Sequence, residues 1–221
     1  MQASSNLKNN ADVWKQLYAE GKNDLRYPND VFVRCCYRYF GSGSVRNILD
    51  YGFGTGANLI HLAQLGYNLS GIEISEHALQ KTRVRLEEKG LNAELQCLEP
   101  GLPLPWASDS FDAVIAWQVL YYNNWDSWRA VFRELDRVLR PGGVFICATA
   151  APGDISQTMA EPLGRGLYRS RVPGQEGCIL AIPDEIGIAE CFPGRTIELG
   201  EFSYRLGEIV TRHWVVVFRK N

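Results

Sequence analysis

Three glycines at alternate positions, Gly52, Gly54 and Gly56, constrain this chain more than any other feature of its sequence. An apolar stretch that ends in Asp50 precedes them, and the amphipathic run 59–65 follows them. This order predicts a buried strand, a tight turn and the first turn of a helix. Glycine accepts positive φ, and without a Cβ it lets a ligand approach the backbone closely. The turn therefore predicts a site for a nucleoside-type ligand, although three glycines can also simply shape a sharp turn.

A second carboxylate, Glu73, ends the next strand-like run, 67–73. In doubly wound sheets an acidic residue about 20 positions after the glycine turn reaches the ribose hydroxyls of a bound nucleoside. A carboxylate accepts hydrogen bonds from both hydroxyls of a diol, and each is worth roughly 1.5–3 kcal/mol. The candidates for binding an adenosine-type ligand are Asp50, Tyr51, Gly52, Gly54, Gly56, Glu73 and Ile74.

Strand-like and helix-like segments alternate along the chain. Apolar strand patterns lie at 45–49, 67–73, 93–98, 111–116 and 144–150, and helical patterns separate several of them at 59–65, 75–89 and 124–139. Such a rhythm, with strands that are apolar nearly throughout, predicts a parallel sheet covered on both faces. Two further strand-like runs, 196–205 and 209–219, are joined by three residues, which is too few for a parallel crossover. The pattern predicts an antiparallel hairpin there.

The predicted fold is therefore α/β, with a doubly wound, mostly parallel seven-stranded sheet, a C-terminal antiparallel hairpin and an N-terminal helical cap. The chain has 221 residues, of which 46% are hydrophobic and 22% charged, and this suits one globular α/β domain. We expect residues 1–221 to form that domain, with a cap at 1–44, a ligand-binding core at 45–150, a substrate-side insert at 151–195 and the hairpin at 196–221.

Charge and cysteine usage limit the partners. The net charge of −2 gives no basic field for a polyanion, so nucleic acid is not the expected partner. No apolar run approaches the roughly 18–20 residues of a membrane span, and the polar N-terminus has no signal-peptide core. The six cysteines form no CxxC pair, so we expect reduced thiols, a cytoplasmic location and no metal site.

Two segments outside the core are candidates for contacting a substrate. Near the N-terminus, a short helix at 11–20 and a second helix beginning at Asn29 or Asp30 flank a loop that carries Arg26 and Tyr27. These two side chains could meet a carboxylate or close off solvent, or they could belong to an ordinary exposed loop. We expect residues 1–10 to be irregular.

The Gly- and Pro-rich insert at 151–195 is expected to form an irregular lid or substrate wall, with a short helix at 183–191. Its arginines Arg165, Arg169 and Arg171 could pair with a carboxylate or phosphate on a substrate. The commoner alternative for such arginines is solvated loop charge.

Five motifs in order resemble those of class I S-adenosylmethionine-dependent methyltransferases. They are Asp50-Tyr-Gly-Phe-Gly-Thr-Gly56, Gly71-Ile-Glu73, Leu102-Pro-Leu-Pro105, Ser110-Phe-Asp-Ala-Val114 and Leu139-Arg-Pro-Gly-Gly143. The resemblance covers about residues 45–150 and implies S-adenosyl-L-methionine as cofactor and S-adenosyl-L-homocysteine as product. It implies that the glycine turn packs against the methionine portion and ribose, and that Glu73 holds the diol. Between these glycines the chain departs from the usual small residues, because it carries Tyr51 and Phe53.

The same resemblance assigns the ends of two further strands. Leu98 or Glu99 would face adenine, and the segment after the fourth strand, with Ala116, Trp117 and Gln118, would line the methionine side. Methyl transfer needs alignment of the acceptor with the methyl–sulfur axis, and orientation of this kind supplies about 7–11 kcal/mol of the barrier. A dedicated base is therefore not always required, and no catalytic residue is identified from the sequence. The nearest candidates are Tyr121, Tyr122 and Asp126, whereas His61 and His213 are expected to be structural.

The expected reaction is methyl transfer to an oxygen or nitrogen of a small-molecule acceptor. No Asn/Asp-Pro-Pro-Tyr or Pro-Cys run follows the fourth strand, which disfavours the adenine and cytosine methyltransferases of DNA. Two alternatives stay open. Gly52-x-Gly54-x-x-Ala57 also satisfies a dinucleotide fingerprint, as in NAD(P)-dependent oxidoreductases, although the predicted hairpin disfavours that fold. The chain could also be a donor-binding protein without catalysis.

Overall fold

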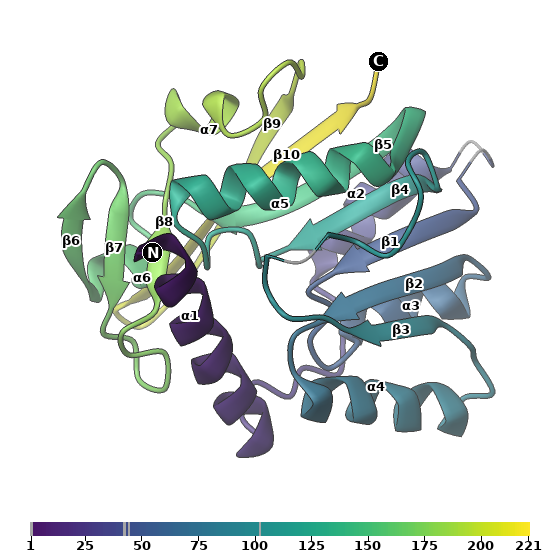
Figure 1. Cartoon of the computed structure of the whole chain (residues 1–221), viewed down its shortest axis with the longest axis horizontal. Coiled ribbons are helices and arrows are strands. Elements are labelled where there is room, and N and C mark those ends of the chain that lie inside the picture. Colours follow the sequence, from purple (N-terminus) through teal and green to yellow (C-terminus); the bar gives the residue numbers. More distant parts are fainter. Residues whose placement is uncertain (1, 42, 44, 102) are drawn as a thin grey trace.

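The computed structural model describes residues 2–41, 43, 45–101 and 103–221 (Figure 1). Leu102, which begins one predicted motif, lies outside the described residues. The helices are α1 (Gln2–Ala19), α2 (Asp30–Phe40), α3 (Ala57–Gln64), α4 (Glu76–Glu88), α5 (Trp125–Val138), α6 (Ile155–Thr158) and α7 (Gly187–Glu190). The strands are β1 (Asn47–Tyr51), β2 (Asn68–Glu73), β3 (Glu94–Cys97), β4 (Phe111–Trp117), β5 (Leu139–Ala150), β6 (Ala160–Gly164), β7 (Leu167–Ser170), β8 (Ile179–Ala181), β9 (Glu198–Leu206) and β10 (Ile209–Arg219).

The main sheet has seven strands in the order β3-β2-β1-β4-β5-β10-β9. The first five are parallel, with Asp50 of β1 opposite Gly71 of β2 and Ile115 of β4. Strand β10 runs antiparallel to β5 and to β9, and the hairpin places Ile209 opposite Leu206. The predicted fold class is confirmed, including the antiparallel hairpin that a short connection required. Because β1, β2 and β4 are parallel neighbours, their carboxyl ends meet at one edge of the sheet.

Side-chain caps begin α2, α4 and α5, whereas α3, which follows β1, begins at Gly56 without one. Ser75 caps α4 by accepting a hydrogen bond from the N–H of Ala78, and Asn124 caps α5 by accepting from the N–H of Ser127. Asn29 caps α2 in the same way. Polar caps satisfy N–H groups that a helix start leaves free. For α4 and α5 the caps fix where the helix begins relative to the end of the strand before it.

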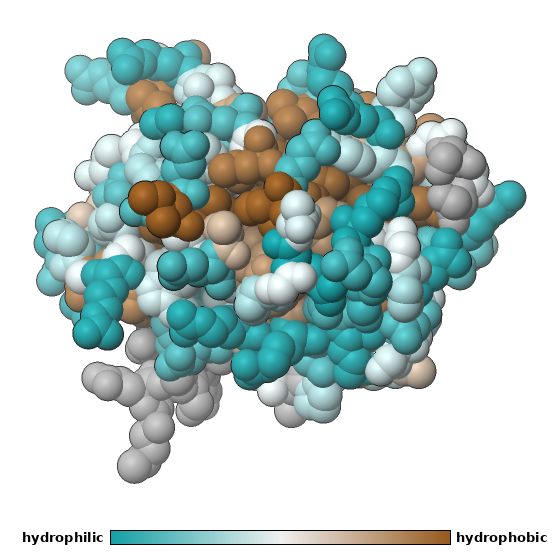
Figure 2. Space-filling view, turned by 90° about the horizontal axis from the view of Figure 1, so that it is seen from above, coloured by the Kyte–Doolittle hydropathy of each residue, from teal (hydrophilic) through white to brown (hydrophobic). Residues whose placement is uncertain are grey.

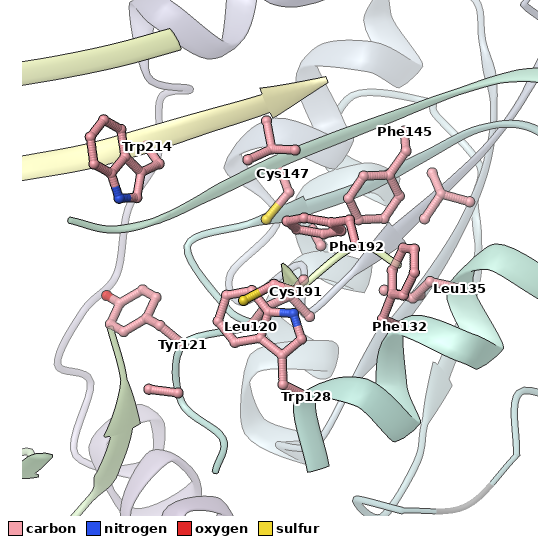
Figure 3. Packing of buried hydrophobic residues seen from close by; sticks show 14 of the residues in the cluster. Leu120, Tyr121, Trp128, Phe132, Leu135, Phe145, Cys147, Cys191, Phe192 and Trp214 are labelled. Atoms are coloured by element: carbon pink, nitrogen blue, oxygen red, sulfur yellow. The ribbon is translucent and has the colours of Figure 1, made fainter. Parts of the chain in front are cut away.

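Two hydrophobic clusters cover the sheet. One cluster takes side chains from α2, α3 and α4, and the other takes side chains from α5 and α7. Figure 1 shows α5 across the near face of the sheet, with α2 and α3 behind it. In the α5 cluster, Phe132 packs edge-on against Phe192 at 5.1 Å between ring centroids (Figure 3). Phe145 stacks on Phe218 at 4.8 Å. This aromatic packing makes α5 a fixed wall beside the carboxyl ends of the strands.

Three segments differ from the sequence predictions. Helix α1 begins at Gln2, so the expected irregular N-terminus is wrong, and the helix at 183–191 shortens to α7. The insert is not irregular, because β6, β7 and β8 form a small antiparallel sheet. These strands have only 5, 4 and 3 residues, and β6 contains Pro162. Runs this short, with proline inside, carry too weak a pattern for prediction.

Figure 2 shows the molecule from above the view of Figure 1, with hydrophobic residues gathered near the centre of this face and hydrophilic residues around them. Within the described part of the chain, none of the helices combines the length and hydrophobicity that crossing a membrane requires.

Candidate active site

Each of the three positions after β1 requires glycine, because a side chain there would be strained or would clash. Their φ angles are +73° at Gly52, +56° at Gly54 and +84° at Gly56. A Cβ on Gly52 would lie 2.5 Å from Cγ2 of Val119, and one on Gly54 would lie 2.8 Å from the hydroxyl of Tyr18. Positive φ is strained for other residues, and these separations are too short for a real Cβ contact. The glycines therefore let the turn after β1 pack against the end of β4 and against α1.

Glu73 ties the end of β2 to this turn. Its Oε2 accepts a hydrogen bond of 2.9 Å from the N–H of Gly54, and its Oε1 accepts from the N–H groups of Ile74 and Ser75. Burial raises the pKa of Glu73, and the three backbone N–H donors oppose that rise. A carboxylate offers about four lone-pair sites. Three are used within the protein, which leaves about one for a ligand hydroxyl.

Asp50 is a second buried carboxylate, one strand away from Glu73. Its side chain is 1% exposed, and its Oδ2 has no hydrogen-bond partner among the described residues. Burial, and secondly the charge of Glu73, raise the pKa of Asp50 to about 7. A buried acceptor without a partner is costly unless a ligand compensates it. The two carboxylates favour a ligand that carries positive charge near the turn.

A cavity of about 970 Å³ lies at this edge of the sheet. One part, here called the turn half, is lined by the ends of β1, β2 and β3, by the connection after β3 and by α5. Its members include Tyr51, Gly52, Phe53, Gly54, Glu73, Ile74, Leu98, Glu99, Leu104, Asp126, Arg133 and Glu134. The other part, here called the aromatic half, is lined by α1, the loop before α2, the segment after β4, the insert and β9. Its members include Asn10, Trp14, Tyr18, Tyr27, Trp117, Gln118, Tyr121, Tyr122, Gln175 and Tyr204.

Most of the predicted site residues line this one cavity. Those that line it are Tyr51, Gly52, Gly54, Glu73, Ile74, Leu98, Glu99, Trp117, Gln118, Tyr121, Tyr122, Asp126 and Tyr27. Those that do not line it are Asp50, Gly56, Ala116, Arg26, Arg165 and Arg169. Asp50 and Ala116 are buried in the sheet, and Gly56 precedes α3 with Thr82 against it. These residues support the cavity from behind.

The arginines of the insert have contacts of their own. Arg169 on β7 lies 3.7 Å from Oε2 of Glu161 on β6, and Arg171 lies 3.6 Å from the same oxygen. Arg165 holds a positive φ in the hairpin between these strands, and its carbonyl accepts from the indole of Trp125. These arginines belong to the small sheet and not to the cavity wall.

Helix α1 supplies site residues that the sequence did not reveal. Asn10 Nδ2 donates to the carbonyls of Tyr122 and Ile179, and Asn10 Oδ1 accepts from the N–H of Ile179. Further along, Lys15 pairs with Glu99 at the end of β3. Both contacts join α1 to segments far away in sequence. Only helical amphipathicity at Trp14 and Tyr18 could have indicated that this helix has a buried face.

The aromatic half contains hydrogen-bonded phenols. The hydroxyl of Tyr121 lies 3.2 Å from that of Tyr122, which donates to Oε1 of Gln175. Figure 3 shows Tyr121 at the margin of the α5 cluster with its hydroxyl directed away from Trp128 and Phe132. Burial raises the pKa of both phenols. They are therefore neutral hydrogen-bonding groups near neutral pH and not bases.

Gln118 is the polar side chain at the end of β4. Its φ is +57°, which is unusual for a residue other than glycine, and its Nε2 lies 3.2 Å from Nε2 of His213 on β10. His213 is 4% exposed, and its Nδ1 lies 3.7 Å from Oδ2 of Asp154. Burial lowers the pKa of His213, and Asp154 opposes that shift. His61, on α3, does not line the cavity.

Comparisons with known proteins agree with this architecture. Residues 48–143 match a family model described as a methyltransferase domain. The sterol 24-C-methyltransferase of Gibberella zeae is 30% identical over 100 residues, which are 44% of this chain and 26% of that protein. A demethylmenaquinone methyltransferase of Tropheryma whipplei is 31% identical over 120 residues, which are 54% of this chain and 48% of that protein. The chain thus spans about half or less of the length of these curated relatives.

Solved structures share the fold across nearly the whole chain. A 1,6-didemethyltoxoflavin N1-methyltransferase of Burkholderia thailandensis, solved with 1,6-didemethyltoxoflavin and S-adenosylhomocysteine, superposes with a TM-score of 0.69. The superposition covers 96% of this chain and 88% of that one, at 16% identity. At this identity the likeness establishes the fold alone.

Proposed function

We propose that this chain, which carries a class I S-adenosylmethionine-dependent methyltransferase domain, transfers a methyl group to an oxygen or nitrogen of a small molecule. One observation carries the proposal. The glycine turn after β1 and the carboxylate of Glu73 after β2 are joined by a hydrogen bond and line the same cavity. This pairing at the carboxyl ends of adjacent parallel strands suits an adenosyl ligand.

The residues present fit S-adenosyl-L-methionine as cofactor. Glu73 and Ile74 would hold the ribose, and Leu98 and Glu99 would border the adenine. The turn from Tyr51 to Gly54 and the main chain of Trp117 and Gln118 would border the methionine portion. Asp50 has a buried oxygen without a partner, so a cationic ligand group would favour its ionised form. This supports a sulfonium donor over an anionic ligand at the turn half.

When bound, the donor supplies a methyl group that leaves sulfur as the acceptor's lone pair forms the new bond, while the C–S electron pair stays on sulfur. The chain's own residues orient the reactants and exclude water from the methyl–sulfur axis, and the proton of the acceptor is released to solvent as the product leaves the cavity. Such orientation can provide about 7–11 kcal/mol. The tyrosines Tyr121 and Tyr122 serve as hydrogen-bonding groups, because burial keeps their phenols protonated.

A small-molecule acceptor is supported by the kind of protein this chain resembles. The relatives named above are called methyltransferases of a sterol and of demethylmenaquinone, and the toxoflavin enzyme binds a small heterocycle. The net charge of −2 gives no general attraction for nucleic acid. The six cysteines are free thiols, which supports a cytoplasmic location.

The rival hydride-transfer function has less support. Strand β10 at the end of the sheet is antiparallel to both β5 and β9, and the matched family model describes a methyltransferase domain. A dinucleotide fingerprint alone is weak evidence. The same fold without catalysis would bind the donor and turn over no acceptor.

Thermal unfolding with ligands tests the proposal. S-adenosyl-L-homocysteine at about 100 times its Kd should add about 2.7 kcal/mol of stability, and NADH should add none. Glu73→Gln removes a charged acceptor, so the Kd for S-adenosyl-L-homocysteine should rise about 10- to 100-fold. Glu88→Gln, on the exposed side of α4, is the matched control and should bind normally. Stabilisation by NADH instead would refute the assignment.

A further inference from the structure

The described walls of the aromatic half carry no formal charge. The side chains that line it are aromatic rings, amides and hydroxyls, with Trp14, Tyr18 and Tyr122 packed against one another from α1 and the segment after β4. The carboxylates beside this half already have partners: Asp126 is 85% exposed and lies 3.4 Å from Arg129, and buried Glu73 accepts three backbone hydrogen bonds. An anionic group held there would be buried without a cation, which is strongly unfavourable. The walls therefore favour an uncharged aromatic guest, with rings packing on rings.

One polar atom in this half is available to a guest. When Nε2 of Gln118 donates to Nε2 of His213, the amide oxygen Oε1 lies on the other side of the amide carbon. That oxygen has no partner among the described residues, and Gln118 lines the cavity. An amide oxygen accepts hydrogen bonds and donates none. It therefore suits a guest that presents an O–H or N–H.

The orientation of the Gln118 amide is imposed by His213. The imidazole is buried, and it stacks on Phe202 with 5.2 Å between ring centroids and 8° between planes. Burial lowers the pKa of His213 and keeps the ring neutral. Nδ1 makes no hydrogen bond among the described residues and lies 3.7 Å from Oδ2 of Asp154, so this carboxylate favours the tautomer with its hydrogen on Nδ1, in which Nε2 accepts the amide N–H. Rotation of the amide would place its N–H₂ in the cavity and its oxygen against a ring nitrogen without a hydrogen. The neutral histidine thus selects the oxygen for the cavity.

We propose that the aromatic half binds an uncharged aromatic molecule whose hydroxyl or amine N–H donates a hydrogen bond to Oε1 of Gln118. The inference rests on the proposed function, because it names the acceptor class for that same site. The hydrogen bond directs the O–H or N–H toward Gln118 and leaves the lone pair free to face the methyl group. Gln118 is then an acceptor-binding residue, and His213 is a positioning residue that acts through it.

Three probes of similar size test the proposal in protein saturated with S-adenosyl-L-homocysteine. They are 2-naphthol, which is uncharged and carries an O–H, 2-methoxynaphthalene, which lacks the O–H, and 2-naphthoate, which is anionic. Ligand-observed NMR titration should give 2-naphthol a Kd at least 5-fold lower than that of either other probe. Absence of 2-naphthol binding, or equal or tighter binding of 2-naphthoate, overturns the inference.

Variants separate the hydrogen bond from general packing. Gln118→Leu should weaken 2-naphthol to the affinity of 2-methoxynaphthalene, while Gln118→Glu retains an oxygen but adds charge and should further disfavour 2-naphthoate. His213→Phe should weaken 2-naphthol and leave 2-methoxynaphthalene unchanged, whereas a merely structural role would weaken both probes equally. Gln80→Leu, on α4, is the control.

Binding of S-adenosyl-L-homocysteine, measured first by calorimetry, separates the two levels of the argument. If it does not bind, the proposed function fails. If it binds but the three probes do not follow the expected order, the proposed function stands and the acceptor class is wrong.

Discussion

The two halves of the cavity are built in different ways. In the turn half, Glu73 and Gly54 are 19 residues apart and meet through backbone N–H groups. In the aromatic half, Asn10 and Ile179 are 169 residues apart and meet through a side chain. Backbone devices such as a glycine turn leave a pattern in the local sequence, whereas side-chain contacts between distant segments leave none. The difference explains why donor chemistry is readable from the sequence and acceptor chemistry is not.

The largest expected effect concerns the folding stability that is lost because Asp50 is buried in the turn half. In the folded protein the pKa of Asp50 is about 7, whereas its ordinary value is 3.8. The folded state then binds a proton that the unfolded state has released, so stability falls as pH rises through this window by about 1.4 kcal/mol per pH unit. Between about pH 5 and pH 8 the wild type should lose about 3 kcal/mol of unfolding free energy, and Asp50→Asn should not show this loss. Urea unfolding measures both proteins. The difference between the two proteins isolates Asp50 from His213, which titrates in both. If the two proteins had parallel pH profiles, the burial of Asp50 would not lower the stability of the folded protein.

A smaller effect tests whether the turn half depends on backbone approach. Gly52→Ala places a Cβ 2.5 Å from Cγ2 of Val119, so the turn must shift and the Kd for S-adenosyl-L-homocysteine should rise roughly 10- to 100-fold. Gly207→Ala, at φ +61° with open space around it, carries similar backbone strain without the clash and should bind normally. Calorimetric titration measures both. If both variants bound S-adenosyl-L-homocysteine equally weakly, backbone strain, and not the clash with Val119, would explain the loss.

The smallest expected effect on donor binding tests whether a change in the aromatic half leaves the turn half intact. Asn10→Ala leaves the N–H of Ile179 without its partner in a buried place, which should cost about 1–3 kcal/mol of unfolding free energy. Asn9→Ala removes one exposed hydrogen bond to Gly177 and should cost less than about 1 kcal/mol. Binding of S-adenosyl-L-homocysteine should stay within about 3-fold in both, a change of well under 1.4 kcal/mol. If Asn10→Ala weakened donor binding as much as Gly52→Ala, the division into two halves would be wrong.

The sequence was informative where a physical rule links neighbours in the chain. The alternation of apolar strands with helices predicted the parallel sheet, and a three-residue connection predicted the hairpin of β9 and β10. The spacing from the glycines to Glu73 placed both at one cavity. Each of these depends on geometry within one strand, one turn or one crossover.

The rest depended on long-range packing. No local rule indicates that α1 lines the cavity, because the hydrogen-bond partners of Asn10 lie beyond residue 120. The arginines Arg165 and Arg169 looked like ligands for an anion, but the strands of a small sheet, too short to predict, carry them away from the cavity. Tyr121 and Tyr122 were identified by position after β4, whereas the partner of Tyr122, Gln175, lies in the insert.

The hydrogen bonds between Asn10 and Ile179 also set an order of events during synthesis. A ribosome adds 169 residues between these two positions, which at about 5–20 residues per second takes roughly 8–34 s. During that interval the emerging chain can already close the turn after β1 around Glu73, but Asn10 lacks the backbone of Ile179 to which it binds. The nascent protein therefore acquires the means to hold a donor well before it acquires the means to choose an acceptor.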